Sequence, residues 1–344
     1  MMRITTNGTL RSYKSNLLRS SNNLSSARDR VLTQRNFTSY AEDPAAATKA
    51  FQLRRSYSRV SDQQTNIQSL VSKFESANSA VSTVKADLVE KYGKVSSLSG
   101  VNGATASGRQ ALGEVLSSSA ESIIQSMNAQ YGNTFIFAGS DGLNVPFSWS
   151  NSGELQYRGI DVDTTDPDEL SSLQAMAEEA VYTDVGAGLS ENQDGSINSA
   201  SAFNSAISGI DILGYGVDSD GDPKNVASIM KQLGEIFSRC DADSGDYASD
   251  ADAEDADRLT GKLNDAMNSL INKWTELDGK STYLTTTQEQ LTTTADSLNE
   301  QILSIEQADL ADALTDFSWA QYCYNAALKV GNNILSQSLI DYMD

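Results

Sequence analysis

Residues 263–305, LNDAMNSLINKWTELDGKSTYLTTTQEQLTTTADSLNEQILSI, place a leucine or isoleucine at every seventh position. These positions are Leu263, Leu270, Leu277, Leu284, Leu291, Leu298 and Ile305. A second ladder with the same spacing lies towards the other end of the chain, at Leu53, Val60, Ile67, Phe74, Val81, Leu88 and Val95. A strict seven-residue repeat forms an apolar seam along a supercoiled helix, and a helix cannot bury its own seam. We therefore expect the two ladders to pack against each other as the core of a helical rod.

The four prolines, at positions 44, 146, 167 and 223, separate this rod from a different middle region. Asp43 and Pro44 form a good helix start, and the helix is expected to run to about Leu98 before Gly100 and Gly103 end it. In the middle region, residues 134–138 have strand character, 147–149 and 155–157 predict a hairpin, and 170–181 predict a short helix. The predicted fold is mainly α: a long antiparallel coiled-coil or bundle rod from both chain ends, with a smaller β-containing (α+β) central domain.

Five segments follow from this pattern: 1–42, 43–145, 146–257, 258–308 and 309–344. The second and fourth form the rod, and the third is a variable β-rich outer domain. The first and last are assembly arms with weaker apolar repeats, which we expect to fold only against a partner. Their seam residues are Leu10, Leu17, Leu24, Val31, Leu314, Phe317, Tyr324, Leu328, Leu335, Leu339 and Tyr342.

Composition and charge exclude several classes of function. The chain has 344 residues, a formal net charge of −21 and no histidine, so the commonest general base and zinc ligand are missing. Residues 150–260 carry five basic and twenty-four acidic residues, which argues against nucleic acid as a partner. Residues 1–60 carry eleven basic against three acidic residues, whereas 301–344 carry one lysine against six acids. The two ends are therefore expected to attract each other.

No catalytic, cofactor or metal site is expected. Cys240 and Cys323 form no spaced motif, and two separate thiols are favoured over a disulfide. The run Asp218-Ser-Asp-Gly-Asp-Pro223 resembles a calcium loop but has glycine at the fourth position and proline at the sixth, so a solvated turn is favoured. The acidic segment 241–257 fails in the same way and is expected to be exposed. Residues 1–30 lack the apolar core of a signal peptide, and no stretch is apolar enough to cross a bilayer.

Several motifs resemble the flagellar hook-associated protein 3 family of flagellin-type proteins. Glu42-Asp43-Pro44 and the three alanines after it are similar to the family's Asp-Asp-Pro-Ala-Ala turn, with glutamate replacing the first aspartate. The stretch 133–139 (Asn-Thr-Phe-Ile-Phe-Ala-Gly) resembles its Asn-Thr…Phe-Gly-Gly sequence, with Ala138 replacing the first glycine. Further similar stretches are 2–5, Arg109 with the helix that follows it, 146–147, 309–313, 324–330 and 337–342. The resemblance covers about residues 2–147 and 259–343.

The resemblance implies a structural subunit of the bacterial flagellum, secreted by the flagellar type III apparatus without a cleaved signal and located outside the cell. It implies a ring of identical subunits between the hook-side junction protein and the first flagellins. It also implies an export chaperone on about residues 300–344. Flagellin itself is an alternative, although its usual Asn-Ser-Ala-x-Asp-Asp-Ala-Ala-Gly stretch is absent from residues 40–47. A secreted coiled-coil effector or needle-tip protein is a further alternative that leaves the Glu-Asp-Pro motif unexplained.

Overall fold

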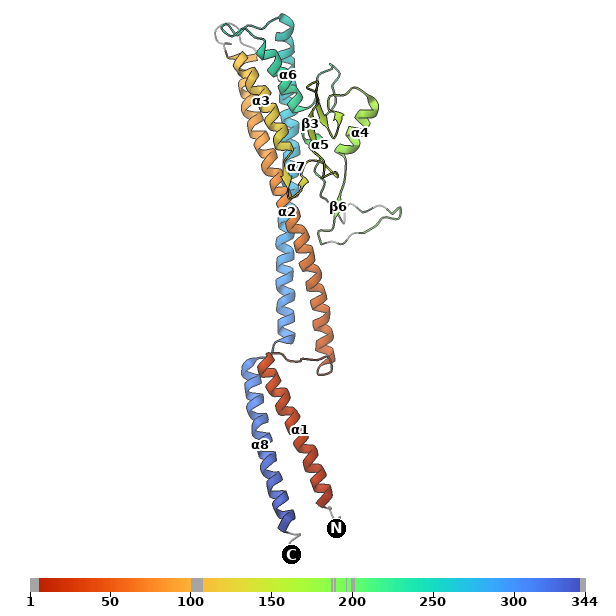
Figure 1. Cartoon of the computed structure of the whole chain (residues 1–344), viewed down its shortest axis with the longest axis vertical. Coiled ribbons are helices and arrows are strands. Elements are labelled where there is room, and N and C mark those ends of the chain that lie inside the picture. Colours follow the sequence, from red (N-terminus) through yellow and green to blue (C-terminus); the bar gives the residue numbers. More distant parts are fainter. Residues whose placement is uncertain are drawn as a thin grey trace. The chain divides into compact units, whose positions relative to one another are not determined.

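The computed structural model describes residues 6–99, 108–186, 188, 190–195, 197–198 and 202–340, with the helical backbone only for 6–7 and 334–340. The chain divides into two compact units, Asp62–Leu291 and an end unit made of Met1–Ser61 and Thr292–Asp344. The described chain is mainly helical with a few short antiparallel strands, which confirms the predicted fold class (Figure 1). Two long helices, α2 (Pro44–Ser99) and α7 (Asp250–Glu306), extend through both units.

The start of α2 follows from the Glu-Asp-Pro motif. The Asp43 carboxylate accepts hydrogen bonds from the amides of Ala45 at 3.1 Å and Ala46 at 2.9 Å, which satisfies two donors that the helix cannot pair itself. The Glu42 carboxylate accepts from the amide of Thr38 at 2.7 Å and from its hydroxyl at 3.0 Å, which closes the turn before the helix. Pro44 is the first helical residue, where its missing amide hydrogen costs nothing.

The two apolar ladders lie on α2 and α7. In Asp62–Leu291 the Asn78 amide donates to Asp278 at 2.7 Å, and the Lys85 ammonium lies 3.1 Å from the centroid of the Trp274 ring. A later residue of α2 thus meets an earlier residue of α7, so the two helices run antiparallel. Ten ladder residues are buried: Val60, Ile67, Phe74, Val81, Leu88, Val95, Leu263, Leu270, Leu277 and Leu284. The other four, Leu53, Leu291, Leu298 and Ile305, are half-buried.

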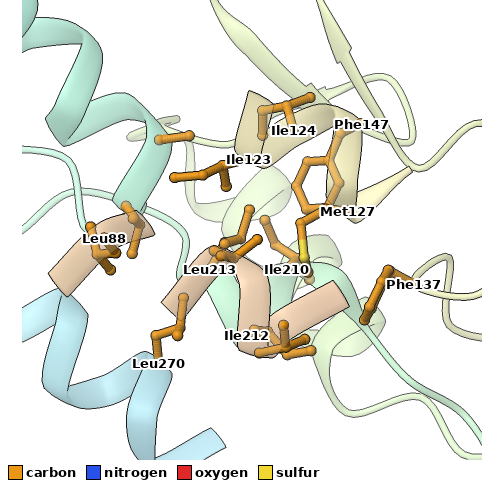
Figure 2. Close-up of a cluster of buried hydrophobic side chains, with 14 of the residues drawn as sticks. Leu88, Ile123, Ile124, Met127, Phe137, Phe147, Ile210, Ile212, Leu213 and Leu270 are labelled. Carbon is orange, nitrogen blue, oxygen red and sulfur yellow. The ribbon is translucent and has the colours of Figure 1, made fainter. Parts of the chain in front are cut away.

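Two shorter helices, α3 (Arg109–Met127) and α6 (Val226–Ser238), pack closely with each other and share the core of α2 and α7. At their crossing, a Cβ atom added to Gly113 would lie 2.6 Å from the backbone nitrogen of Ser238, and one added to Gly234 would lie 2.9 Å from the carbonyl oxygen of Gly113. Glycine is therefore required at both positions. Figure 2 shows the core in which Leu88, Ile123 and Leu270 meet the middle region.

The β-containing part covers residues 130–213. The predicted hairpin is present, with β3 (Phe147–Trp149) paired to β4 (Leu155–Tyr157) and β4 paired in turn to β5 (Ile160–Asp161). Two-stranded pairs are formed by β1 (Gln130–Tyr131) with β2 (Thr134–Phe135) and by β6 (Tyr182–Thr183) with β7 (Phe203–Asn204). The helices α4 (Pro167–Ala177) and α5 (Gly209–Leu213) complete this part.

Two local predictions need correction. The strand predicted over 134–138 ends at Phe135, because the next residues bond to a distant loop, with the Gly209 amide donating to Phe137 at 2.8 Å. The helix predicted over 170–181 begins earlier, because Asp166 caps it by accepting from the Asp168 amide. Residues 250–257 of the acidic segment form the first turns of α7, where acidic side chains are favoured, and these side chains are exposed or half-buried as expected.

Candidate assembly interface

The end unit contains an antiparallel pair of helices, α1 (Thr6–Thr33) and α8 (Leu310–Ile340) (Figure 1). The guanidinium of Arg30 lies 3.3 Å from the carboxylate of Asp316 near one end of the pair. Further along, the ring of Tyr13 lies directly against Gly331, and a Cβ atom there would overlap the ring unless Tyr13 moved. The expected attraction between the basic N-terminal end and the acidic C-terminal end thus takes the form of two ion pairs among residues 8–333, Arg30 with Asp316 and Arg54 with Glu306.

The seam between α1 and α8 has the alternating three- and four-residue spacing of a coiled coil. The α1 side is half-buried or buried at Tyr13, Leu17, Ser20, Leu24, Ala27 and Val31. The α8 side is half-buried or buried at Ala313, Phe317, Ala320, Tyr324, Ala327 and Gly331. Four of the six α8 residues are alanine or glycine, so the helices approach closely while burying little apolar surface.

The arm residues identified from the sequence divide into two groups. Leu17, Leu24, Val31, Phe317 and Tyr324 lie in this seam. In contrast, Leu10, Leu314 and Leu328 are exposed, at 41%, 47% and 43%. The side chains of Leu335 and Leu339 and all of Tyr342 lie outside the described residues. The α8 seam partners Ala313, Ala320 and Ala327 were missed, although their own seven-residue spacing is visible in the sequence.

Large apolar side chains are exposed mainly on the end unit. It holds about a third of the chain but thirteen of the twenty-one large exposed apolar side chains among the described residues. They are Leu10, Leu18, Leu32, Tyr40, Phe51, Tyr57, Leu303, Leu310, Leu314, Trp319, Tyr322, Leu328 and Val330. The rings of Trp319 and Tyr322 stack with centroids 5.8 Å apart, although each residue is 67% exposed. Such a concentration of exposed apolar surface indicates a protein–protein interface.

The two connections that join this pair to α2 and α7 are hydrogen-bonded to each other. The side-chain amide of Asn36 donates to the carbonyls of Ile305 at 3.1 Å and Gln307 at 3.0 Å. The backbone amide of Ala308 donates to the carbonyl of Gln34, whose φ of 55° places it in the left-handed region. Arg54 pairs with Glu306 close by. These bonds hold the connection between α1 and α2 beside the connection between α7 and α8.

The acidic run at 218–223 is held by cations of α7. Lys262 pairs with Asp218 and Asp220, and Arg258 lies 2.7 Å from the carboxylate of Asp222. Hydrogen bonding to Lys262 is the main reason that the pKa of Asp218 falls to about 2. The three carboxylates converge as a metal ligand set would, but they already have cationic partners. The turn predicted from the sequence is therefore clamped to α7, with Asp222 buried rather than solvated.

Arg109, singled out from the sequence only through the family resemblance, joins three parts of the larger unit through its buried guanidinium. Arg109 is fully buried, and it donates to the carbonyls of Leu98 at 2.8 Å, Ser99 at 3.1 Å and Gly245 at 2.8 Å. Its guanidinium also lies 3.9 Å from the centroid of the Tyr247 ring. Arg109 therefore caps the C-terminal end of α2 and holds the loop before α7 against it.

The two cysteines are not paired with each other. Both cysteines are free thiols, with Cys240 buried and Cys323 half-buried on α8. Within the described chain, no helix is both long and apolar enough to cross a membrane.

Comparisons with known proteins show the fold. No protein-family model and no curated protein match the chain. Among solved structures, it is similar to a candidate flagellar hook-associated protein from Vibrio parahaemolyticus, with a TM-score of 0.56 and 18% identity over 77% of this chain and 99% of the other. FlgL from Bacillus cereus gives a TM-score of 0.49 with 15% identity over 73% and 99% of the two chains. The flagellar hook-associated protein-3 of Legionella pneumophila gives 0.49 with 10% identity over 74% and 98%.

Proposed function

We propose that this chain is a structural subunit of the bacterial flagellum and forms the junction ring between hook and filament, on which flagellin polymerises. It acts as a building block without catalytic activity. The observation that carries the proposal is the α1/α8 pair, whose weak seam leaves large apolar residues exposed in a chain with the fold of a hook-associated protein. The motifs at residues 42–47 and 324–330 support the same family.

The partners follow from this role. Identical copies form the ring through the arm residues, the hook-side junction protein lies below it and flagellin lies above it. The chain reaches this place through the flagellar type III export apparatus without a cleaved signal, so its final location is extracellular. An export chaperone covers the C-terminal region before secretion, around residues 300–344, where Leu310, Leu314 and Trp319 are exposed.

Deletion of the gene tests the role directly. We expect cells with complete hooks but no attached filaments, because flagellin lacks the surface on which it polymerises and leaks into the medium. Electron microscopy of the flagella and immunoblotting of the medium measure both effects. The control is the same strain with the gene restored on a plasmid. Normal filaments and motility in the deletion strain would refute the proposal.

Flagellin is the second candidate, because a filament subunit would need the same exposed arms. The Glu42-Asp43-Pro44 turn favours the junction role, since flagellin carries Asp-Asp-Ala-Ala-Gly in the corresponding stretch. Counting copies per flagellum distinguishes the two. Roughly one ring of subunits fits the junction protein, whereas thousands of copies would establish flagellin.

A further inference from the structure

The helices α1 and α8 pair large residues with small ones along the described part of their seam. Counting along both helices from the contact between Tyr13 and Gly331, the seam positions lie level in pairs, because each helix rises about 1.5 Å per residue. The pairs are Tyr13 with Gly331, Leu17 with Ala327, Ser20 with Tyr324, Leu24 with Ala320, Ala27 with Phe317 and Val31 with Ala313. One residue of every pair is alanine, glycine or serine, so the two helices approach closely.

This alternation of sizes excludes some shifts of one helix along the other, but not all. A shift of three or four residues would bring Leu24 level with Phe317 or Tyr324, and two large side chains do not fit where a large and a small one packed. A shift of seven residues that moves α1 away from its connection to α2 brings Leu24 level with Ala327, and the alternation is kept. The opposite shift is excluded because it brings the rings of Tyr13 and Tyr324 level. The seam alone therefore permits two registers.

A set of hydrogen bonds at the end of the helix pair is specific for one of these registers. We call it the clasp, and it consists of residues 34–36 and 305–308. Arg35 and Gln307 form an antiparallel bridge, and the backbone amide of Asn36 donates to the carbonyl of Glu306 at 2.8 Å. The side chain of Asn36 donates to two more carbonyls of the second segment. Carbonyls at the end of α7 have no partner within the helix, so the clasp supplies their donors in one alignment of the two segments.

The lengths of the two connections show which helix can slide. Residues 307–309 join α7 to α8, and these three residues hold the start of α8 close to the end of α7. Residues 34–43 join α1 to α2, and ten residues can span roughly 33 Å when extended. A slide by seven residues moves α1 by about 10 Å. The longer connection can accommodate this movement once the clasp is open.

We propose that the clasp selects the register of the α1/α8 pair, whereas the seam packs the helices without deciding which heptads meet. The ion pair between Arg30 and Asp316 adds little to this choice, because exposed ion pairs contribute little to stability. The register matters because a slide would move every exposed residue of α1 by about 10 Å past those of α8. The proposal concerns a single chain and does not depend on the flagellar role.

The distance between two spin labels in the full chain measures the register. Cys240→Ala and Cys323→Ser remove the native thiols. Ser12→Cys and Ser318→Cys then place one label on an exposed position of each helix. In the native register these two positions are offset by roughly 20 Å along the pair, so a slide changes the distance between the labels. Pulsed electron paramagnetic resonance should give a single distance for the chain with an intact clasp.

The double substitution Asn36→Ala and Arg54→Ala weakens the clasp, since Arg54 pairs with Glu306. It should add a second population in which the distance is longer by most of the ~10 Å slide. Thr38→Ala is the matched control, because the Thr38 hydroxyl donates to Glu42 within the same connection. The control should keep the single distance.

Each other outcome would overturn the proposal. A single unchanged distance in the double variant would mean that the seam alone fixes the register. Two distances in the chain with an intact clasp would mean that the clasp does not select between the registers. Circular dichroism distinguishes a slide from melting, and a loss of helix with a broad spread of distances would mean that the clasp keeps the arms folded instead. Filament attachment in the deletion strain is a separate result, so the proposed function stands or fails independently.

Discussion

The buried carboxylate of Asp163 allows a quantitative prediction of how the stability of the larger unit depends on pH. Its carboxylate follows β5, and the Oδ1 atom is buried without a hydrogen-bond partner. Burial is the main cause that raises the pKa of Asp163 to about 6, and the nearby Asp161 carboxylate adds to it. Because the folded pKa lies above the ordinary value of 3.8, the folded protein binds more protons than the unfolded chain between these two values. This group therefore lowers stability as pH rises from about 4 to about 6, and its penalty is complete above that range.

Asp163→Asn removes the charge while keeping the shape. A difference of about two pKa units corresponds to roughly 3 kcal/mol at most, so the variant should be more stable by up to that amount at pH 7.5. The gain should fall to about half at pH 5, where the wild-type carboxyl is mostly protonated in the folded state. Urea unfolding, followed by the fluorescence of Trp149 and Trp274, measures this difference. Asp265→Asn is the control, since Asp265 is exposed on α7. A variant that is equally stable or less stable at pH 7.5 would refute the reasoning.

Three further predictions concern the helices. Gly113→Val should lower the free energy of unfolding by about 1–3 kcal/mol more than Gly261→Val in denaturant titrations, because a Cβ at Gly261 meets open space; equal losses would show that α3 and α6 can separate freely. Leu328→Asp should leave the isolated chain folded, because Leu328 is exposed, but it should prevent incorporation into flagella, because a contact with another subunit there would bury an unpaired carboxylate. Incorporation at the wild-type level would contradict this. In the isolated chain, amides of 8–33 and 310–333 should exchange hydrogen faster than those of 67–95, and equal protection would show that the arms are already stable alone.

The sequence predicted those parts of the fold that depend on local or periodic signals. The ladder residues from Ile67 to Val95 show their burial through spacing alone, and Asp43 with Pro44 marks the start of α2 by its own hydrogen-bonding chemistry. The hairpin between β3 and β4 follows from the turn residues between its strands. None of these features needs knowledge of a distant partner.

Features that depend on distant partners could not be predicted. Arg109 can be buried because its guanidinium donates to the carbonyls of Leu98 and Gly245, which lie far apart in the sequence. No spacing in the sequence predicts that arrangement. Gly139 has a φ of 67°, and a Cβ there would collide with the Glu179 carboxylate from a segment forty residues away. In the arms, the leucines at 314 and 328 and the alanines at 313, 320 and 327 are both spaced by multiples of seven, so spacing alone could not decide which set lies in the seam.

The alanines and glycine of the α8 seam fit the proposed role of the arms in assembly. Apolar burial contributes about 25 cal/mol per Å², so Ala313, Ala320, Ala327 and Gly331 stabilise the isolated pair far less than leucines would. Leu10, Leu314 and Leu328 are exposed instead, and under the proposed role they would leave water only when another copy covers them. If the proposed assembly is right, the arms gain most of their stability on contact between chains, whereas α2 and α7 bury their large residues within one chain. Leucines in the α8 seam would push Tyr13 away from Gly331, and if copies of the chain assemble as proposed, stability of the free arm and assembly would oppose each other.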